Sequence, residues 1–164
     1  MFDFHAYIER LCAENRLCAA EGFHPCSCSG LGYIEDLLAR LRSHKAFLCT
    51  CDTCEESTLR RGGAWFKRRV FTVFVLHRFA PRSTAGYRDA LAVCREVLRQ
   101  LHARFIRDEE ALRSALTYLD TADVRSRELG GEFLDGCTGL YFMVAIDEPI
   151  DLSYDDTLWQ RTTP

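Results

Sequence analysis

Hydrophobic and polar positions alternate with two different periods along the chain, and the helical period dominates three segments. Apolar residues recur every three or four positions over residues 4–18 and 31–41, which predicts two amphipathic helices. Residues 84–112 show the same spacing over a longer run, with arginines off the apolar stripe, and are predicted to form the main helix. Between the first two helices, residues 23–28 are predicted to be a short extended segment.

The remaining apolar residues follow a period of two, which is typical of strands. The run at 65–80 is the longest, and because it is apolar on both faces it is predicted to lie in the centre of a sheet. Residues 52–63 are polar and are predicted to form a connection. Other strands are predicted over 46–51, 116–119, 124–129 and 139–146.

The order of these elements predicts the fold class. Helices do not alternate one-for-one with strands, which argues against a doubly wound parallel sheet. We expect an α+β fold in which an antiparallel sheet packs as a two-layer sandwich against two N-terminal helices and one long central helix. No segment has the composition of a linker, so residues 1–164 are predicted to form a single domain with three parts: a helical part (1–44), the sheet with the long helix (45–150) and an acidic tail (151–164).

Composition and charge narrow the class of protein without specifying a function. The chain has 164 residues, of which 48% are hydrophobic and 27% charged, as in ordinary globular domains. No uncharged run approaches the about 20 residues of a membrane span, and the formal charge of −3 gives no whole-chain reason to expect nucleic acid. The first residues lack the pattern of an export signal, so we expect a reducing cytosol in which the nine cysteines remain thiols.

The cysteines support two interpretations. Cys49 and Cys51 are two positions apart in a predicted strand, so they would share one face as small core residues, and buried thiols are the favoured interpretation. The alternative is a zinc-binding regulatory or interaction module, because zinc is usually held by two close-spaced pairs of thiolate or imidazole ligands. That alternative requires convergence of the candidate ligands His24, Cys26 and Cys28 with Cys51 and Cys54.

Catalytic motifs give no positive prediction. The chain has no Gly-x-Ser-x-Gly, no His-Glu-x-x-His and no glycine-rich phosphate-binding loop. His77 falls within the long predicted strand and is interpreted as a sheet residue rather than as a general base. We therefore expect a non-enzymatic protein with no catalytic residues and no cofactor.

Charge is segregated along the chain more strongly than the net value suggests. Residues 57–82 contain seven basic residues and no acid, whereas residues 147–156 contain five acids and no base. Each segment can be a solvated surface, the two can meet across a subunit boundary, or the basic segment can contact DNA phosphates; we rank DNA below protein contact. The candidate interaction residues are Arg60, Arg61, Lys67, Arg68, Arg69, Asp151, Asp155 and Asp156.

The order of the elements also carries a resemblance to a known family. It rests on residues 68–76 (RRVFTVFVL) followed by a long helix, on residues 136–147 (GCTGLYFMVAID), and on residues 149–155 (PIDLSYD) with Trp159. Over about residues 45–155 the chain resembles the tail-terminator and tail-completion proteins of tailed bacteriophages and prophages. The N-terminal helical pair and the cysteine-rich segments have no counterpart in this resemblance.

The resemblance implies a structural role and a set of partners. Members of that family are non-enzymatic subunits of rings, often hexameric, that cap the tail tube and join it to the head. It implies that residues 52–63 form a mobile arm and that residues 60–69 face a neighbour or the ring lumen. The implied partners are copies of the chain and phage tail-tube or neck proteins, with no membrane, and with nucleic acid only as DNA passing through a lumen. The implied location is the bacterial cytoplasm during assembly and then the virion.

Overall fold

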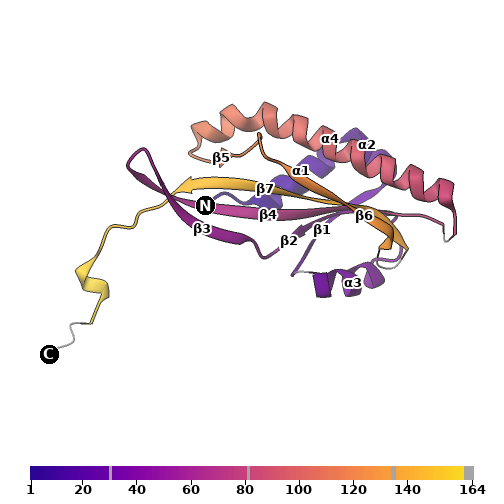
Figure 1. Ribbon diagram of the computed structural model, residues 1–164, viewed down its shortest axis with the longest axis horizontal. Coiled ribbons are helices and arrows are strands. Elements are labelled where there is room, and N and C mark those ends of the chain that lie inside the picture. The colour runs from indigo at the N-terminus through magenta and orange to yellow at the C-terminus, as the bar shows by residue number, and fades with distance from the viewer. Residues whose placement is uncertain (30, 81, 134–135, 161–164) are drawn as a thin grey trace.

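One sheet runs the length of the molecule and carries helices on both of its faces (Figure 1). The computed structural model describes residues 1–29, 31–80, 82–133 and 136–160. The helices are α1 (Phe4–Glu14), α2 (Arg16–Glu21), α3 (Leu31–Arg40), α4 (Thr84–Ser114) and the short 3-10 helix η1 (Asp156–Leu158). The strands are β1 (Phe23–Cys28), β2 (Ala46–Cys51), β3 (Glu55–Arg61), β4 (Ala64–Arg78), β5 (Tyr118–Leu119), β6 (Arg125–Phe133) and β7 (Cys137–Pro149).

The strand order is β1-β2-β4-β7-β5, with β3 also paired to β4 and β6 also paired to β7. The α+β class and the central place of the longest strand are thereby confirmed, because β4 pairs with β2, β3 and β7. Every pairing except one is antiparallel. The exception is β1 with β2, which run parallel, because the connection between them contains α3 and so returns the chain to the same end of the sheet.

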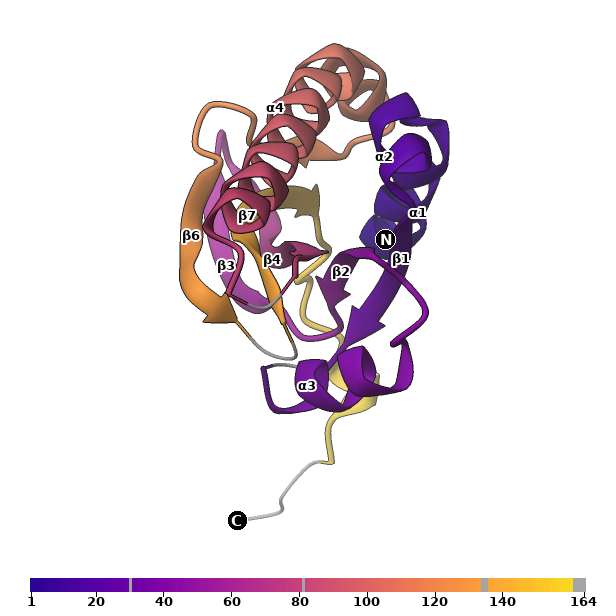
Figure 2. The same ribbon diagram turned by 90° about the vertical axis from the view of Figure 1, so that its right-hand side faces the viewer.

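The two faces of the sheet bury two separate apolar clusters. On one face, α1 and α4 cover β4 and β7, and the fully buried Phe4, Phe105 and Phe142 lie in that cluster. On the other face, α3 packs Ile34 and Leu38 into a smaller cluster over β2 and β4. Figure 2 shows α3 on the side of the sheet opposite α4. The expected two-layer sandwich is therefore extended by a small third layer beneath one part of the sheet.

A single residue interrupts the helix predicted over residues 4–18. The backbone of Asn15 is extended, and its N–H donates to the carbonyl oxygen of Leu11 at the end of α1. The side-chain oxygen of Asn15 then accepts from the N–H of Cys18, which caps the start of α2. The expected single helix is therefore wrong, whereas the extended segment predicted over residues 23–28 of the N-terminal part is confirmed as β1.

The polar connection predicted over residues 52–63 contains a strand. Residues 55–61 form β3, which pairs in antiparallel register with β4 through a turn at Gly62 and Gly63. Because six of its seven residues are exposed, β3 has no apolar alternation that a periodicity argument could detect. Most of the segment that the resemblance implies to be an arm is therefore a strand paired to β4 at an edge of the sheet.

Gly139 allows β7 to approach β4 closely. Its φ is 155°, and a Cβ atom built at this position would lie 2.0 Å from the backbone oxygen of Val75. Any residue with a side chain would collide with the backbone of β4, so the longest pairing in the sheet depends on a glycine here. Among the helices of the described ranges, none is both long enough and apolar enough to cross a membrane.

Candidate interaction surface and thiol array

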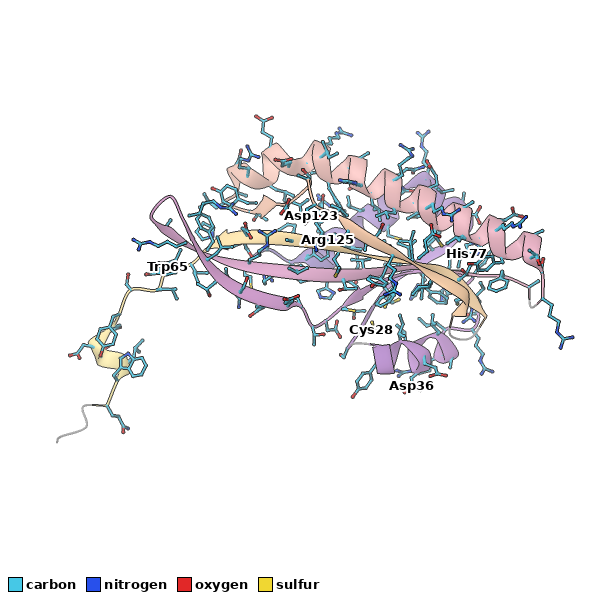
Figure 3. The ribbon with its side chains drawn as sticks, in the orientation of Figure 1. Cys28, Asp36, Trp65, His77, Asp123 and Arg125 are labelled. Atoms are coloured by element: carbon cyan, nitrogen blue, oxygen red, sulfur yellow. The ribbon has the colours of Figure 1, made fainter. Side chains whose placement is uncertain are left out.

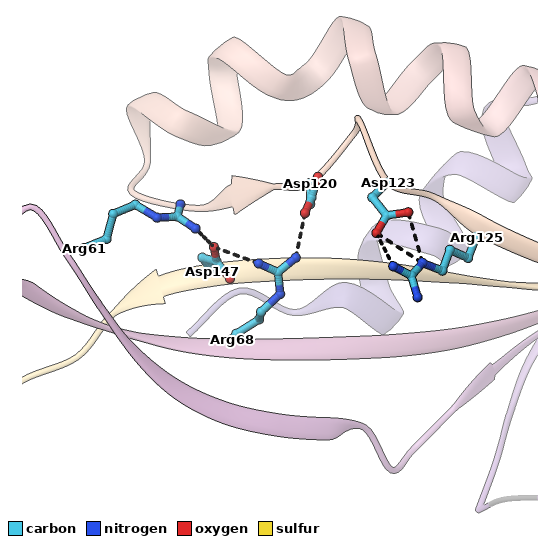
Figure 4. A network of polar contacts seen from close by, with 6 residues as sticks. All are labelled: Arg61, Arg68, Asp120, Asp123, Arg125 and Asp147. Carbon is cyan, nitrogen blue, oxygen red and sulfur yellow. Dashed lines mark hydrogen bonds and ion pairs between the residues drawn. The ribbon is translucent and has the colours of Figure 1, made fainter.

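Strand register brings part of the predicted basic stretch directly against acids of the same chain. Arg68 on β4 lies opposite Asp147 on β7. Its Nη2 donates to Oδ2 of Asp120 at 2.6 Å, and its Nη1 is 3.6 Å from Oδ2 of Asp147. Arg61 on β3 reaches the same Asp147 oxygen at 3.2 Å (Figure 4). Two arginines that are neighbours in the predicted patch therefore share one carboxylate.

Asp147 is the buried centre of this network. It is only 4% exposed, and its second oxygen, Oδ1, has no hydrogen-bond partner among the described residues. A carboxylate removed from water is destabilised unless cations compensate for the lost hydration, and Arg61 and Arg68 provide that compensation. A cavity of about 440 Å³ adjoins the network, lined by Arg61, Arg113, Tyr118, Leu119, Asp120 and Asp147.

The two other β4 residues of the predicted basic set, Lys67 and Arg69, face the opposite side of the sheet from Arg68. Arg69 forms an ion pair with Glu148, and its guanidinium also donates to the backbone oxygen of Phe2. The N–H of Phe2 in turn donates to Glu148, so this group fastens the N-terminal segment to β7. Lys67 pairs with Glu56 at 2.8 Å and lowers the pKa of that carboxyl. No local sequence pattern predicts these pairings, because they depend on strand register.

The end of the β3–β4 hairpin brings exposed basic and aromatic side chains together. We call residues 60–65 the hairpin tip. The Arg60 guanidinium lies over the Trp65 ring, 5.6 Å from its centroid, and Trp65 itself is 41% exposed (Figure 3 labels Trp65). Arg61 is also largely open to solvent although it pairs with Asp147. The hairpin tip therefore presents two guanidinium groups and an indole at one end of the molecule.

The acidic segment identified over residues 147–156 divides into two parts with different structures. Asp147 and Glu148 belong to β7, whereas the described residues beyond 150 leave the sheet and extend away from the body (Figure 1). We call residues 151–160 the C-terminal arm; residues 161–164 lie outside the described residues. Asp151 accepts from the N–H of Ser153, and Asp155 accepts from the N–H of Thr157 at η1. Hydrogen bonds from the side chains of Ser153 and Thr157, together with these backbone hydrogen bonds, lower the pKa of both carboxyls.

The C-terminal arm exposes large apolar side chains between its acids. Leu152 is 54% exposed, Tyr154 71%, Leu158 80% and Trp159 65%. The rings of Tyr154 and Trp159 stack on each other with centroids 6.0 Å apart. Exposed apolar residues concentrated in one short segment are typical of a surface that another protein covers.

Four cysteines form an array on the sheet face that α3 covers. The parallel register pairs Cys26 with Cys49 and Cys28 with Cys51. The Sγ atoms of Cys28 and Cys51 are 3.9 Å apart, and hydrogen bonds with Cys26 and Cys28, together with burial, raise the pKa of Cys49. Figure 3 shows Cys28 at the sheet above the helix that carries Asp36. We call Cys26, Cys28, Cys49 and Cys51 the thiol array.

The structure does not bring the five predicted zinc ligands together. Cys54 packs against the apolar cluster on the opposite face of the sheet, and its Sγ is 3.8 Å from Oε1 of Glu56. The His24 ring stacks on His44 with centroids 4.1 Å apart, and burial together with the His44 charge lowers the pKa of His24. In the described part of the chain, no three histidine, cysteine, aspartate or glutamate side chains are arranged to hold a metal ion.

His77 occupies the sheet position that its sequence context indicates. It is 4% exposed on β4, with Nε2 3.3 Å from a carboxylate oxygen of Glu21 and Nδ1 2.7 Å from the carbonyl oxygen of Arg78. Its two ring nitrogens thus contact groups from α2 and its own strand. This arrangement joins the second helix to the sheet.

Comparisons with protein families and with curated proteins found no match. The features that bear on function are therefore the hairpin tip, the C-terminal arm, the charged network around Asp147 and the thiol array.

Proposed function

We propose that this protein is a non-enzymatic structural subunit that assembles with copies of itself and docks to tail-tube or neck proteins of a bacteriophage or prophage. The observation that carries the proposal is the C-terminal arm, which leaves the body and exposes Tyr154 and Trp159 beside several carboxylates. The sheet with its long helix agrees with the fold that the resemblance implies. Assembly would take place in the bacterial cytoplasm, and the subunit would remain in the virion.

The partner surface that fits the C-terminal arm is the hairpin tip of a second copy. The arm offers carboxylates and aromatic rings, and the tip offers the Arg60 and Arg61 guanidinium groups with the Trp65 indole. Opposite charges orient such an encounter, and arginine stacks well on aromatic rings. Buried aromatic side chains contribute about 150–250 Å² each, so Tyr154 and Trp159 supply a substantial part of the about 800 Å² per partner of a stable interface.

A contact between an arm and a tip joins two different surfaces, so each subunit can give one arm and receive another. Such a heterologous contact builds a closed ring or an open filament according to the rotation between neighbours. The remaining basic residues of the predicted set, Lys67, Arg68 and Arg69, are engaged within their own subunit and hold the sheet together.

The experiment that tests this proposal is the mass of the assembly as a function of protein concentration, measured by light scattering or sedimentation. The full chain should form oligomers, and a chain ending at residue 150 should be monomeric at the same concentrations. Replacing Asp155 and Asp156 by lysine should weaken association at low salt, and adding R60E should restore part of it. The matched control is Asp36→Lys, an exposed charge reversal on α3 at a distance from the arm (Figure 3).

Two results would contradict the proposal. One is a full chain that stays monomeric at every concentration and in the presence of tail-tube protein. The other is an oligomer whose mass is unchanged when residues 151–164 are removed. Electron microscopy of the oligomer then distinguishes rings from filaments.

A further inference from the structure

The thiol array contains one pair of cysteines with the geometry of a closable disulfide. Cys28 and Cys51 are register partners at the ends of β1 and β2, and their side chains lie on the same sheet face. Paired residues on neighbouring strands have backbones about 4.8 Å apart, which falls within the range of Cα separations found in disulfides. Their Sγ atoms are already in contact at 3.9 Å. Closing the bond requires rotation of the side chains and little movement of the backbone.

The position of this pair at the end of the strands gives an oxidant a route to it. Cys28 is 4% exposed and Cys51 is 7% exposed, but the residues that follow them, Ser29 and Asp52, are both exposed. β1 is the last strand in the sheet order, so its end is held by pairing on one side. Ends of edge strands open locally far more often than the whole protein unfolds. Local opening of β1 therefore exposes Cys28 and Cys51 without loss of the core.

The other two thiols of the array, Cys26 and Cys49, lie beside the pair formed by Cys28 and Cys51. Cys49 is fully buried and hydrogen-bonds both Cys26 and Cys28. Cys26 is the most open member of the array. The hydrogen bonds with Cys26 and Cys28, together with burial, raise the pKa of Cys49 and keep it a thiol, so it is a poor attacking group toward a disulfide between Cys28 and Cys51.

We propose that Cys28 and Cys51 are a reversible oxidation site that takes hydrogen peroxide as its oxidant. One thiolate attacks peroxide, forms a sulfenic acid and releases hydroxide. The second thiolate then attacks the sulfenic sulfur, the S–S bond forms, and the oxygen leaves as hydroxide that is protonated to water. Overall two thiols and one peroxide give one disulfide and two waters. The disulfide closes a covalent loop that contains α3 and links edge strand β1 to β2.

The test is to treat the full chain with hydrogen peroxide, alkylate the remaining thiols and determine the mass. We expect seven alkylated cysteines instead of nine, and nine again after reduction. Trypsin should release a linked pair of peptides, residues 17–40 and 46–60. Each of these peptides contains three cysteines, so variants identify the bond: Cys28→Ala and Cys51→Ala should each abolish the link, whereas Cys54→Ala should retain it.

Three outcomes would overturn the proposal. The first is a wild-type chain that keeps nine alkylatable thiols after peroxide treatment under conditions in which it remains folded. The second is a link that survives in Cys28→Ala or Cys51→Ala, because another pair would then form the bond. The third is stoichiometric zinc in the purified chain that protects the four thiols from peroxide. The peptide mapping of the wild type does not depend on whether any variant folds.

Discussion

Arg68 and Asp147 face each other across the β4–β7 ladder, and their ion pair joins the predicted basic stretch to the start of the predicted acidic segment within one subunit. Antiparallel pairing places the two residues in register, because β4 and β7 align along most of their length. Folding therefore brings part of the basic stretch into contact with part of the acidic segment, so some of the segregated charges pair within one subunit. The candidate interaction residues that remain exposed, Arg60, Arg61, Asp151, Asp155 and Asp156, lie at the hairpin tip and on the C-terminal arm.

Removal of the Arg68 charge should destabilise the fold. In Arg68→Met the buried Asp147 carboxylate keeps only Arg61, which is itself largely exposed. We expect the free energy of unfolding to fall by about 2–3 kcal/mol, since an undercompensated buried charge is costly. Denaturant titration measures this change. The control is Arg125→Met, which removes an exposed pair with Asp123 (Figure 4) and should cost at most about 0.5 kcal/mol. Equal losses in both variants would contradict the assigned role of Asp147.

Gly139→Ala should be among the most damaging small substitutions in the sheet. The added Cβ would meet the backbone oxygen of Val75, so β7 and β4 must separate locally. We expect a loss of about 3 kcal/mol or more, measured by thermal or denaturant unfolding. Gly130→Ala on β6 is the matched control, because no atom lies within 4 Å of its new Cβ. That control should change stability by less than about 1 kcal/mol. A tolerated Gly139→Ala would show that the close approach of the two strands is dispensable.

Stability should fall as the pH is lowered through the titration range of histidine. Burial and the neighbouring His44 lower the pKa of His24 in the folded chain, so the unfolded chain binds more protons near pH 6. Folding is therefore favoured above the unfolded pKa of about 6.5 and loses this contribution below it. His24→Phe keeps a ring against His44 and should flatten the profile between pH 7 and 5. Denaturant unfolding at several pH values tests this, and an unchanged slope in the variant would contradict it.

Asn15→Ala should weaken the junction between α1 and α2. The substitution removes the cap on the Cys18 N–H and the hydrogen bond from the Asn15 amide to Gln100, 2.9 Å long. A loss of about 1 kcal/mol is expected, which lowers the melting temperature by roughly 2–4 °C for a chain of this size. Asn15→Asp keeps the capping oxygen and should lose less. If both variants melt like the wild type, the cap does not stabilise the bend.

The main elements could be predicted because their periodicity is strong. The formation of the other strands depends on pairing with segments that are distant in the sequence. β4, α4 and β7 could be predicted because each presents a long apolar pattern to the core. β3 could not, because it is stabilised by pairing with β4 and leaves both of its faces largely in solvent. The parallel direction of β1 depends on where α3 returns the chain, which no local pattern specifies.

The candidate sites were predictable to different extents. The spacing of Cys49 and Cys51 indicated that these two share a face, but their contact with Cys26 and Cys28 follows from the parallel register. The partners of Arg68 and Lys67 could not be predicted, since Asp120 and Glu56 lie on separate elements. The acidic character of the C-terminal arm was apparent, whereas its departure from the body was not.

The edge formed by β1 contains Pro25, and this has a consequence for how copies of the chain can meet. An outer strand normally offers a row of amide hydrogens to any incoming strand, and proline has none to offer. Pro25 therefore interrupts the row of backbone donors near the middle of β1, so another strand cannot extend the sheet continuously from this edge. This edge is therefore a poor template for the continuous backbone pairing on which fibre-like stacking depends.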